Sequence, residues 1–171
     1  RSFRQEFLAT FETYGSVIAY NFKREVHVTP IKNPNLTELH VGIDFNVNPC
    51  TAAIMYRHGN TLYQIDEVYI NDSNTGELAD EIKKRYPNSR ITAYPDPAGR
   101  QRKTSANGQT DFTILTNAGF TVKAPNKHNE VRDRINSMNA RLKTVDGLVH
   151  YYIDPKCKHT IESLEKFAYK E

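Results

Sequence analysis

Two aspartates stand at positions where a carboxylate is unusual. Asp44 lies in the short apolar segment 39–45, and Asp96 directly follows the apolar segment 90–94, between two prolines that fix its backbone. A charge at a buried strand end is costly unless a positive group compensates it. Two such carboxylates on neighbouring strands would repel each other unless a divalent cation lay between them, as in phosphoryl-transfer sites with paired Mg²⁺ or Mn²⁺ ions. The sequence therefore predicts a metal site at Asp44 and Asp96, although each could instead be a turn carboxylate.

The second chemical feature is an excess of positive charge in the middle of the chain. Residues 97–143 hold nine basic and three acidic side chains, within a chain of net charge +3. Such a stretch attracts polyanions, nucleic acid first among them, although it could also be a solvated surface. We expect contacts to the DNA backbone, without base readout, from a loop after Asp96 and from a later helix with the residue before it. The predicted DNA-binding residues are Arg100, Arg102, Lys103, Lys127, Arg134 and Arg141. For Arg134, a salt bridge is the alternative.

Hydrophobic periodicity predicts the elements that must position these residues. Three segments at 39–45, 51–57 and 61–69 alternate like strands of an antiparallel meander. Helical and strand-like segments then alternate, with helices at 74–86, 111–117, 130–143 and 160–168 and strands at 90–94, 120–124 and 148–153. This pattern predicts an α/β domain with a mixed sheet. A further short helix is expected at 2–11, before a linker that contains Pro30 and Pro34.

Length and composition exclude several other classes of protein. The 171 residues suit one domain, and 38% hydrophobic residues suffice for a packed core. No apolar run is long enough to span a membrane, and no signal peptide is visible. Two cysteines cannot form a disulfide framework, which favours a reducing compartment. A phosphate-binding loop and a serine-nucleophile motif are both missing, so neither ATP hydrolysis by that route nor serine chemistry is expected.

Several segments, in order, resemble one family. Val41–Phe45 looks like a first catalytic strand, and Ala93–Gly99 looks like a second catalytic turn. Two later segments, Asn129–Asn136 and Tyr152–Lys158, also resemble segments of the same family. Segment 2–27 looks like a connector. Together they resemble the carboxy-terminal nuclease domain of the large terminase subunit of tailed bacteriophages, whose fold is ribonuclease H-like. Each motif is weak alone, and their order and spacing carry the match.

The resemblance implies a fold and an activity. The sheet order would be 3-2-1-4-5, with 1–36 as the connector from a missing motor domain and 37–171 as the nuclease domain. The activity would be cleavage of double-stranded viral DNA during genome packaging by two-metal phosphodiester hydrolysis, with two Mg²⁺ or Mn²⁺ ions. Asp44 would bridge the ions and Asp96 would ligate one of them. The implied partners are double-stranded DNA, the motor domain of the same chain, the small terminase subunit and the portal, in the host cytoplasm.

The sequence departs from the family pattern at its carboxyl end. The family usually supplies a third acidic ligand from a helix there, and we expect this ligand beyond Glu171, with the nuclease domain truncated. Asp154, after the strand-like segment 148–153, is a stand-in metal ligand, although it could simply be a helix-entry carboxylate. Two alternatives stay open: a catalytically silent DNA-binding or motor-docking module, and a resolvase- or transposase-type nuclease on the same fold.

Overall fold

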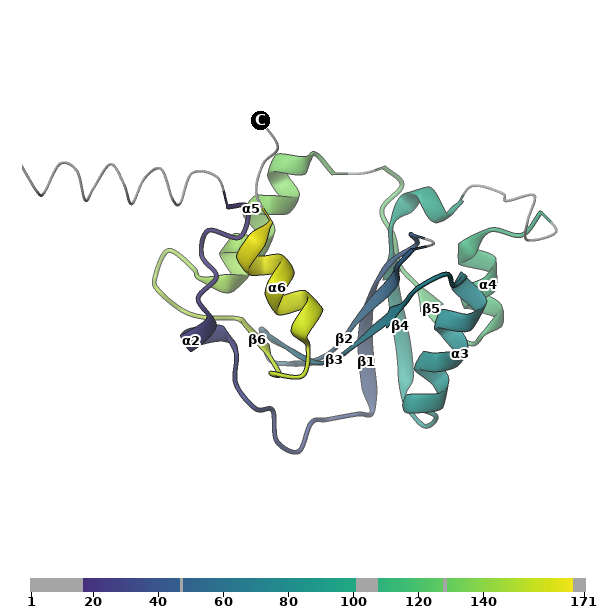
Figure 1. Ribbon diagram of the computed structural model, residues 1–171, viewed down its shortest axis with the longest axis horizontal. Coiled ribbons are helices and arrows are strands. Elements are labelled where there is room, and N and C mark those ends of the chain that lie inside the picture. The colour runs from purple at the N-terminus through teal and green to yellow at the C-terminus, as the bar shows by residue number, and fades with distance from the viewer. Residues whose placement is uncertain (1–16, 47, 101–107, 128, 168–171) are drawn as a thin grey trace, which may run out of the picture.

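The computed structural model describes residues 17–46, 48–100, 108–127 and 129–167. Its centre is a six-stranded mixed sheet with helices on both faces (Figure 1). The helix expected at 2–11 lies outside the described residues. Within them, no helix is both long and apolar enough to cross a membrane.

The antiparallel part of the sheet is the predicted meander. β1 (Glu38–Asp44) pairs with β2 (Cys50–His58), which pairs with β3 (Thr61–Ile70). Along β1 the side chains of Leu39, Val41 and Ile43 are buried on one face, while the intervening residues point to the other. This alternation places Asp44 on the opposite face from the main core.

Three parallel strands complete the sheet. β4 (Arg90–Pro95) pairs with β1, β5 (Thr121–Val122) with β4, and β6 (Tyr151–Ile153) with β3. The observed order is β5-β4-β1-β2-β3-β6. The expected order 3-2-1-4-5 is present within this sheet, but the full order differs from it, because the strand-like segment 148–153 adds a sixth strand beyond β3. Both of the last two strands are shorter than expected.

One face of the sheet is covered by α3 (Thr75–Arg85) and α4 (Asp111–Asn117) (Figure 1). Asn74 caps α3, because its side chain accepts a hydrogen bond of 3.0 Å from the Glu77 backbone N–H. Leu78 and Ile82 of α3 pack on the buried residues of β1, β2 and β4 to form the main core. A short 3-10 turn, η1 (Pro97–Arg100), links β4 to the region before α4.

The other face carries α5 (Val131–Leu142) and α6 (Lys158–Lys166), with the short α2 (Arg24–His27) at their side (Figure 1). A smaller core of Ile153, Cys157 and Ile161 lies between β6 and α6. Glu67 of β3 holds the start of α6, because its carboxylate accepts hydrogen bonds from the backbone N–H of His159 (2.8 Å) and of Thr160 (2.9 Å).

Part of the predicted connector packs against these helices. The buried Asn139 of α5 accepts a hydrogen bond of 3.0 Å from the Asn21 backbone N–H, and its amide donates one of 2.9 Å to the Ile18 carbonyl. Arg24 of α2 forms a two-pronged ion pair with Glu165 of α6, with distances of 2.7 and 2.8 Å. Segment 17–28 thereby fixes α5 and α6 relative to each other. The expected boundary at residue 36 stays a prediction.

Candidate metal centre and nucleic-acid interface

Asp44 and Asp96 end two neighbouring parallel strands. The register of β1 and β4 pairs Ile43 with Pro95, so the next position sets Asp44 beside Asp96. Neighbouring strands lie about 4.8 Å apart, and side chains at paired positions point to the same face. The carboxyl ends of parallel strands are where ligands of open α/β sheets usually bind. The topology therefore brings these two carboxylates together.

A pocket of about 310 Å³ opens between these strand ends and the start of α5. Asp44 and Asp96 line it together with Arg134, so that two carboxylates and one guanidinium face the same space. Asp44 is exposed and Asp96 is half-buried, so both are accessible to ions from solvent. The remaining lining residues are Ile43, Tyr94, Pro95, Pro97, Pro125 and Asn129.

Local hydrogen bonds orient the two carboxylates. The Asn46 side-chain amide donates to Asp44 Oδ2 at 2.9 Å. The Ala98 backbone N–H donates to Asp96 Oδ1 at 2.8 Å, and the Gly99 N–H donates to the Asp96 carbonyl at 3.0 Å. Asp96 therefore closes the η1 turn with its backbone carbonyl and with Oδ1, and its side chain also lines the pocket.

Gly99 sets the spacing between the two turns. A Cβ placed on Gly99 would lie 2.4 Å from Cε2 of Phe45 and 2.9 Å from Cε1 of Phe112. Phe45 directly follows Asp44, and Gly99 lies three residues after Asp96. The missing side chain thus lets the turn after β4 pack on the residue that follows the first carboxylate.

The donor set fits a hard divalent cation. Mg²⁺ is usually held by one or two carboxylates, with water and substrate phosphates as the other ligands. Asp44 and Asp96 supply such a pair in one pocket. Within the described ranges, no group of three or more His, Cys, Asp or Glu side chains is arranged to hold a metal. These residues therefore provide two ligands, not a complete cage.

The structure places Asp154 elsewhere. It follows β6, which is separated from β1 by β3 and β2, so it lies roughly 14 Å from β1 across the sheet. Its Oδ2 accepts a hydrogen bond of 3.0 Å from the Ile31 backbone N–H, and its Oδ1 accepts one of 3.1 Å from the Lys156 N–H. The structure therefore does not bring Asp154, the stand-in metal ligand, together with Asp44 and Asp96: its carboxylate closes the turn before α6 and fixes the linker.

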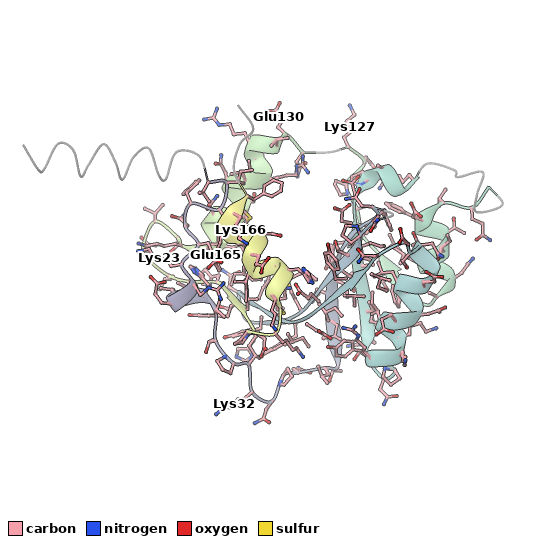
Figure 2. All side chains as sticks on the ribbon, in the orientation of Figure 1. Lys23, Lys32, Lys127, Glu130, Glu165 and Lys166 are labelled. Carbon is pink, nitrogen blue, oxygen red and sulfur yellow. The ribbon has the colours of Figure 1, made fainter. Side chains whose placement is uncertain are left out.

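The predicted DNA-binding residues fall into different places. Arg134 lines the acidic pocket, and Arg141 of the same helix lines a second pocket on the same face. Lys127 projects outward from the loop between β5 and α5 (Figure 2). Arg102 and Lys103 lie outside the described residues.

Arg100 has a structural contact that its sequence position did not suggest. Its guanidinium donates hydrogen bonds to the carbonyls of Ala124 (2.9 Å) and Pro125, and it lies 5.1 Å from the centre of the Phe112 ring. Arg100 therefore ties the turn after β4 to the segment after β5. Because Pro125 lines the acidic pocket, this contact also shapes the pocket wall.

Three residues of the site were not singled out from the sequence. Asn46 orients Asp44, Asn129 lines the pocket, and Tyr94 lines both pockets. Tyr94 could have been found, because strand alternation puts it on the same face as Asp96, two residues later. The contact of Asn129 depends on the path of the loop between β5 and α5, which no local pattern specifies.

Fold and site together define a class: a ribonuclease H-like α/β domain with two carboxylates at the ends of adjacent central strands. Several solved structures of other proteins have a similar fold. The large terminase from the thermophilic bacteriophage D6E, in complex with ADP, is similar with a TM-score of 0.67 and 19% identity over 91% of this chain and 38% of that one. The chain thus spans well under half of that protein.

Isolated nuclease domains match over most of both chains. The P22 large terminase nuclease domain has a TM-score of 0.64 and 15% identity, and the match covers 90% of this chain and 84% of that one. The large terminase nuclease from thermophilic phage G20c with bound magnesium has a TM-score of 0.55 and 12% identity, with 91% and 82% covered. Neither a protein-family model nor a curated protein matches this chain. The chain has the fold of large terminase nuclease domains.

Proposed function

We propose that this domain is a divalent-metal-dependent endonuclease that cleaves double-stranded DNA during viral genome packaging, as the nuclease part of a terminase large subunit. The observation that carries the proposal is the shared pocket of Asp44, Asp96 and Arg134. Two carboxylates suit a hard cation, and the adjacent guanidinium suits the phosphate that such a cation would bring in. The bound magnesium of the G20c nuclease supports the choice of ion.

Asp44 and Asp96 would hold the ions, Mg²⁺ or Mn²⁺. Bound there, divalent ions would neutralise phosphate charge and would stabilise the entering and leaving oxygens of phosphodiester hydrolysis. The protein contributes position: Asn46 and the Ala98 N–H hold the carboxylates in place at distances of 2.9 and 2.8 Å. Asp44 comes from a central strand, a rigid support that keeps such a geometry without reorganisation.

Arg134 would orient the scissile strand. It projects from the first turns of α5 into the same pocket, and no carboxylate of the described residues forms an ion pair with it. A guanidinium presents several N–H donors in a planar fork, which matches phosphate oxygens. Lys127, exposed on the loop before α5, would add a longer-range contact to the DNA backbone. Such contacts are independent of sequence, so we expect cleavage without strong base preference.

The proposed partners follow from the role in packaging. They are double-stranded DNA, a motor domain in the same native chain, the small terminase subunit and the portal, all in the cytoplasm of an infected bacterium. The packed segment 17–28 supports the link to a motor, because hydrogen bonds from this segment to Asn139 would pass a pull on the connector directly to α5.

The proposal is tested by plasmid cleavage with Mn²⁺ or Mg²⁺, with and without a chelator. We expect Asp44→Asn and Asp96→Asn each to reduce cleavage by at least about a hundredfold, since each removes a charged ligand. Asp80→Asn is the matched control, because Asp80 is exposed on α3, on the opposite face of the sheet. Full activity of Asp44→Asn, or equal losses in all three variants, would refute the proposed function.

A further inference from the structure

A second pocket, of about 300 Å³, lies on the same face of the sheet as the acidic pocket. Strand pairing explains its floor: His40 pairs with Met55, Arg57 with Leu62, and Gly42 with Tyr94. Because paired residues point to the same face, the side chains of these residues other than Gly42 border one space. Arg141, near the end of α5, also lines this pocket.

The charge of this second pocket is positive. Arg57 Nε donates a hydrogen bond of 2.8 Å to the Gly59 carbonyl, and Arg141 Nη1 donates one of 2.9 Å to the Asn60 carbonyl. Both guanidinium groups are thus anchored to the turn between β2 and β3. Neither forms an ion pair with a carboxylate anywhere in the described part of the chain, and none of the residues lining the pocket is acidic. Each guanidinium retains further N–H donors for an anion.

Apolar and aromatic groups form the rest of the wall. Met55 and Leu62 provide an apolar surface beside the two arginines. Tyr94 and His40 are hydrogen-bonded, with 3.0 Å between the hydroxyl and Nδ1, and their rings lie 5.7 Å apart. A Cβ on Gly42 would meet no atom within 4 Å, so the floor is open at that point. A ligand that fits this lining carries a negative charge on one side and an apolar or planar group on the other.

The acidic pocket and the second pocket are neighbours, because Tyr94 lines both of them. Along β1, His40 and Asp44 are four positions apart, which is roughly 13 Å of strand. Along α5, Arg134 and Arg141 are seven positions apart, which is about two helical turns or about 10.5 Å. A nucleic-acid strand that runs between α5 and the sheet would therefore contact both pockets within a few nucleotides.

We infer that the second pocket binds a nucleotide unit, with its phosphate on Arg57 and Arg141 and its sugar or base against Met55 and Leu62. The inference rests on the proposed function when the nucleotide belongs to the DNA strand that enters the acidic pocket. The same chemistry would recognise a free nucleotide, and the experiment separates the two sources.

The test measures binding without metal, in EDTA, so that it does not depend on cleavage. A short fluorescein-labelled DNA duplex is one probe, read by anisotropy, and deoxyadenosine monophosphate is the other, read by calorimetry. Two variants change the pocket in different ways: Arg57→Gln combined with Arg141→Gln removes the charge, and Gly42→Val fills the open floor without removing a cation. Lys84→Gln, on the opposite face in α3, is the control for a lost surface cation.

We expect the double variant to bind duplex at least about tenfold more weakly, with the slope of log K against log salt reduced by about 1 to 2. Gly42→Val is expected to weaken duplex binding several-fold with its thermal stability retained, whereas Lys84→Gln changes little. If the pocket variants bind deoxyadenosine monophosphate more weakly but bind the duplex as tightly as before, the pocket is assigned to a free nucleotide. If both probes bind both pocket variants as tightly as they bind Lys84→Gln, the inference is refuted. Because no cleavage is measured, that result is distinguishable from a failure of the proposed nuclease activity.

Discussion

Replacing Gly99 by alanine tests how the two carboxylates are held in register. The new methyl group would lie 2.4 Å from Cε2 of Phe45, well inside the optimum of about 3.5–4.0 Å for carbon atoms. Gly99 does not have the positive φ that favours glycine, so backbone strain adds nothing. The Phe45 ring must therefore move by about 1 Å, and the residue before it is Asp44.

The expected cost follows from two opposing effects. Overpacking of a filled site costs about 1–3 kcal/mol, while alanine lowers the entropy of the unfolded chain and returns about 0.4–1 kcal/mol. The net destabilisation is then about 1–2 kcal/mol, or a fall in Tm of about 3–6 °C for a chain of this size. Because Asp44 directly precedes Phe45, we expect the shift of Phe45 to displace the Asp44 carboxylate as well, and a displacement of about 1 Å should reduce metal-dependent cleavage by at least about tenfold.

Urea unfolding and plasmid cleavage are measured on the same preparations. Gly42→Ala is the control for stability, because a Cβ there meets no atom within 4 Å. Phe45→Leu removes the ring, so the Gly99→Ala and Phe45→Leu double variant should cost less than the sum of the two single variants by about 1 kcal/mol. If Gly99→Ala matches wild type in both assays, or if the two substitutions are additive, the packing argument is wrong.

Other consequences of the contacts can be measured separately. Glu67→Gln weakens the hydrogen bonds to Thr160 and the start of α6, so we expect a loss of about 1–2 kcal/mol in urea unfolding; an unchanged midpoint would contradict this. The hydrogen-bonded Arg24 guanidinium lowers the pKa of Glu165, so this pair stabilises the fold above the unfolded-state pKa of about 4.3, and the contribution is lost as the pH falls through the lower folded-state pKa. In Arg24→Gln, the free energy of unfolding should therefore fall less steeply at acid pH than in the wild type. The same acid dependence in both proteins would exclude this effect. Burial raises the pKa of the Cys157 thiol to about 12, so a thiol reagent at pH 8 should label it only on unfolding, not in the native protein.

The central sheet could be predicted from the sequence because its signals are local. Apolar residues alternate along β1, and the turn His58-Gly59-Asn60 follows β2, so both signals predict the meander. The capping Asn74 marks the start of α3. The site follows from the same signals: Asp44 and Asp96 each end an apolar strand, and the parallel pairing of those strands sets them side by side.

The remaining features depend on long-range contacts. The apolar spacing of 130–143 predicts that Val131 is buried, yet Val131 is 57% exposed, whereas Asn139 is buried. Asn139 is buried because segment 17–28 packs on α5 through it, with a sequence separation of 118 residues between Asn21 and Asn139. The role of Asp154 also depends on a long-range contact, because its partner Ile31 lies 123 residues away in the sequence. The structural contact of Arg100 depends on the segment after β5, which local charge does not indicate.

The claim that Asp44 and Asp96 together hold divalent cations is tested most directly by anomalous diffraction from crystals soaked in Mn²⁺. We expect manganese in the pocket between β1, β4 and α5, with oxygens of both carboxylates about 2.1 Å from a metal. Crystals of Asp44→Asn should lose that density. Two carboxylates that point away from each other, or manganese bound only at other sites, would contradict the claim.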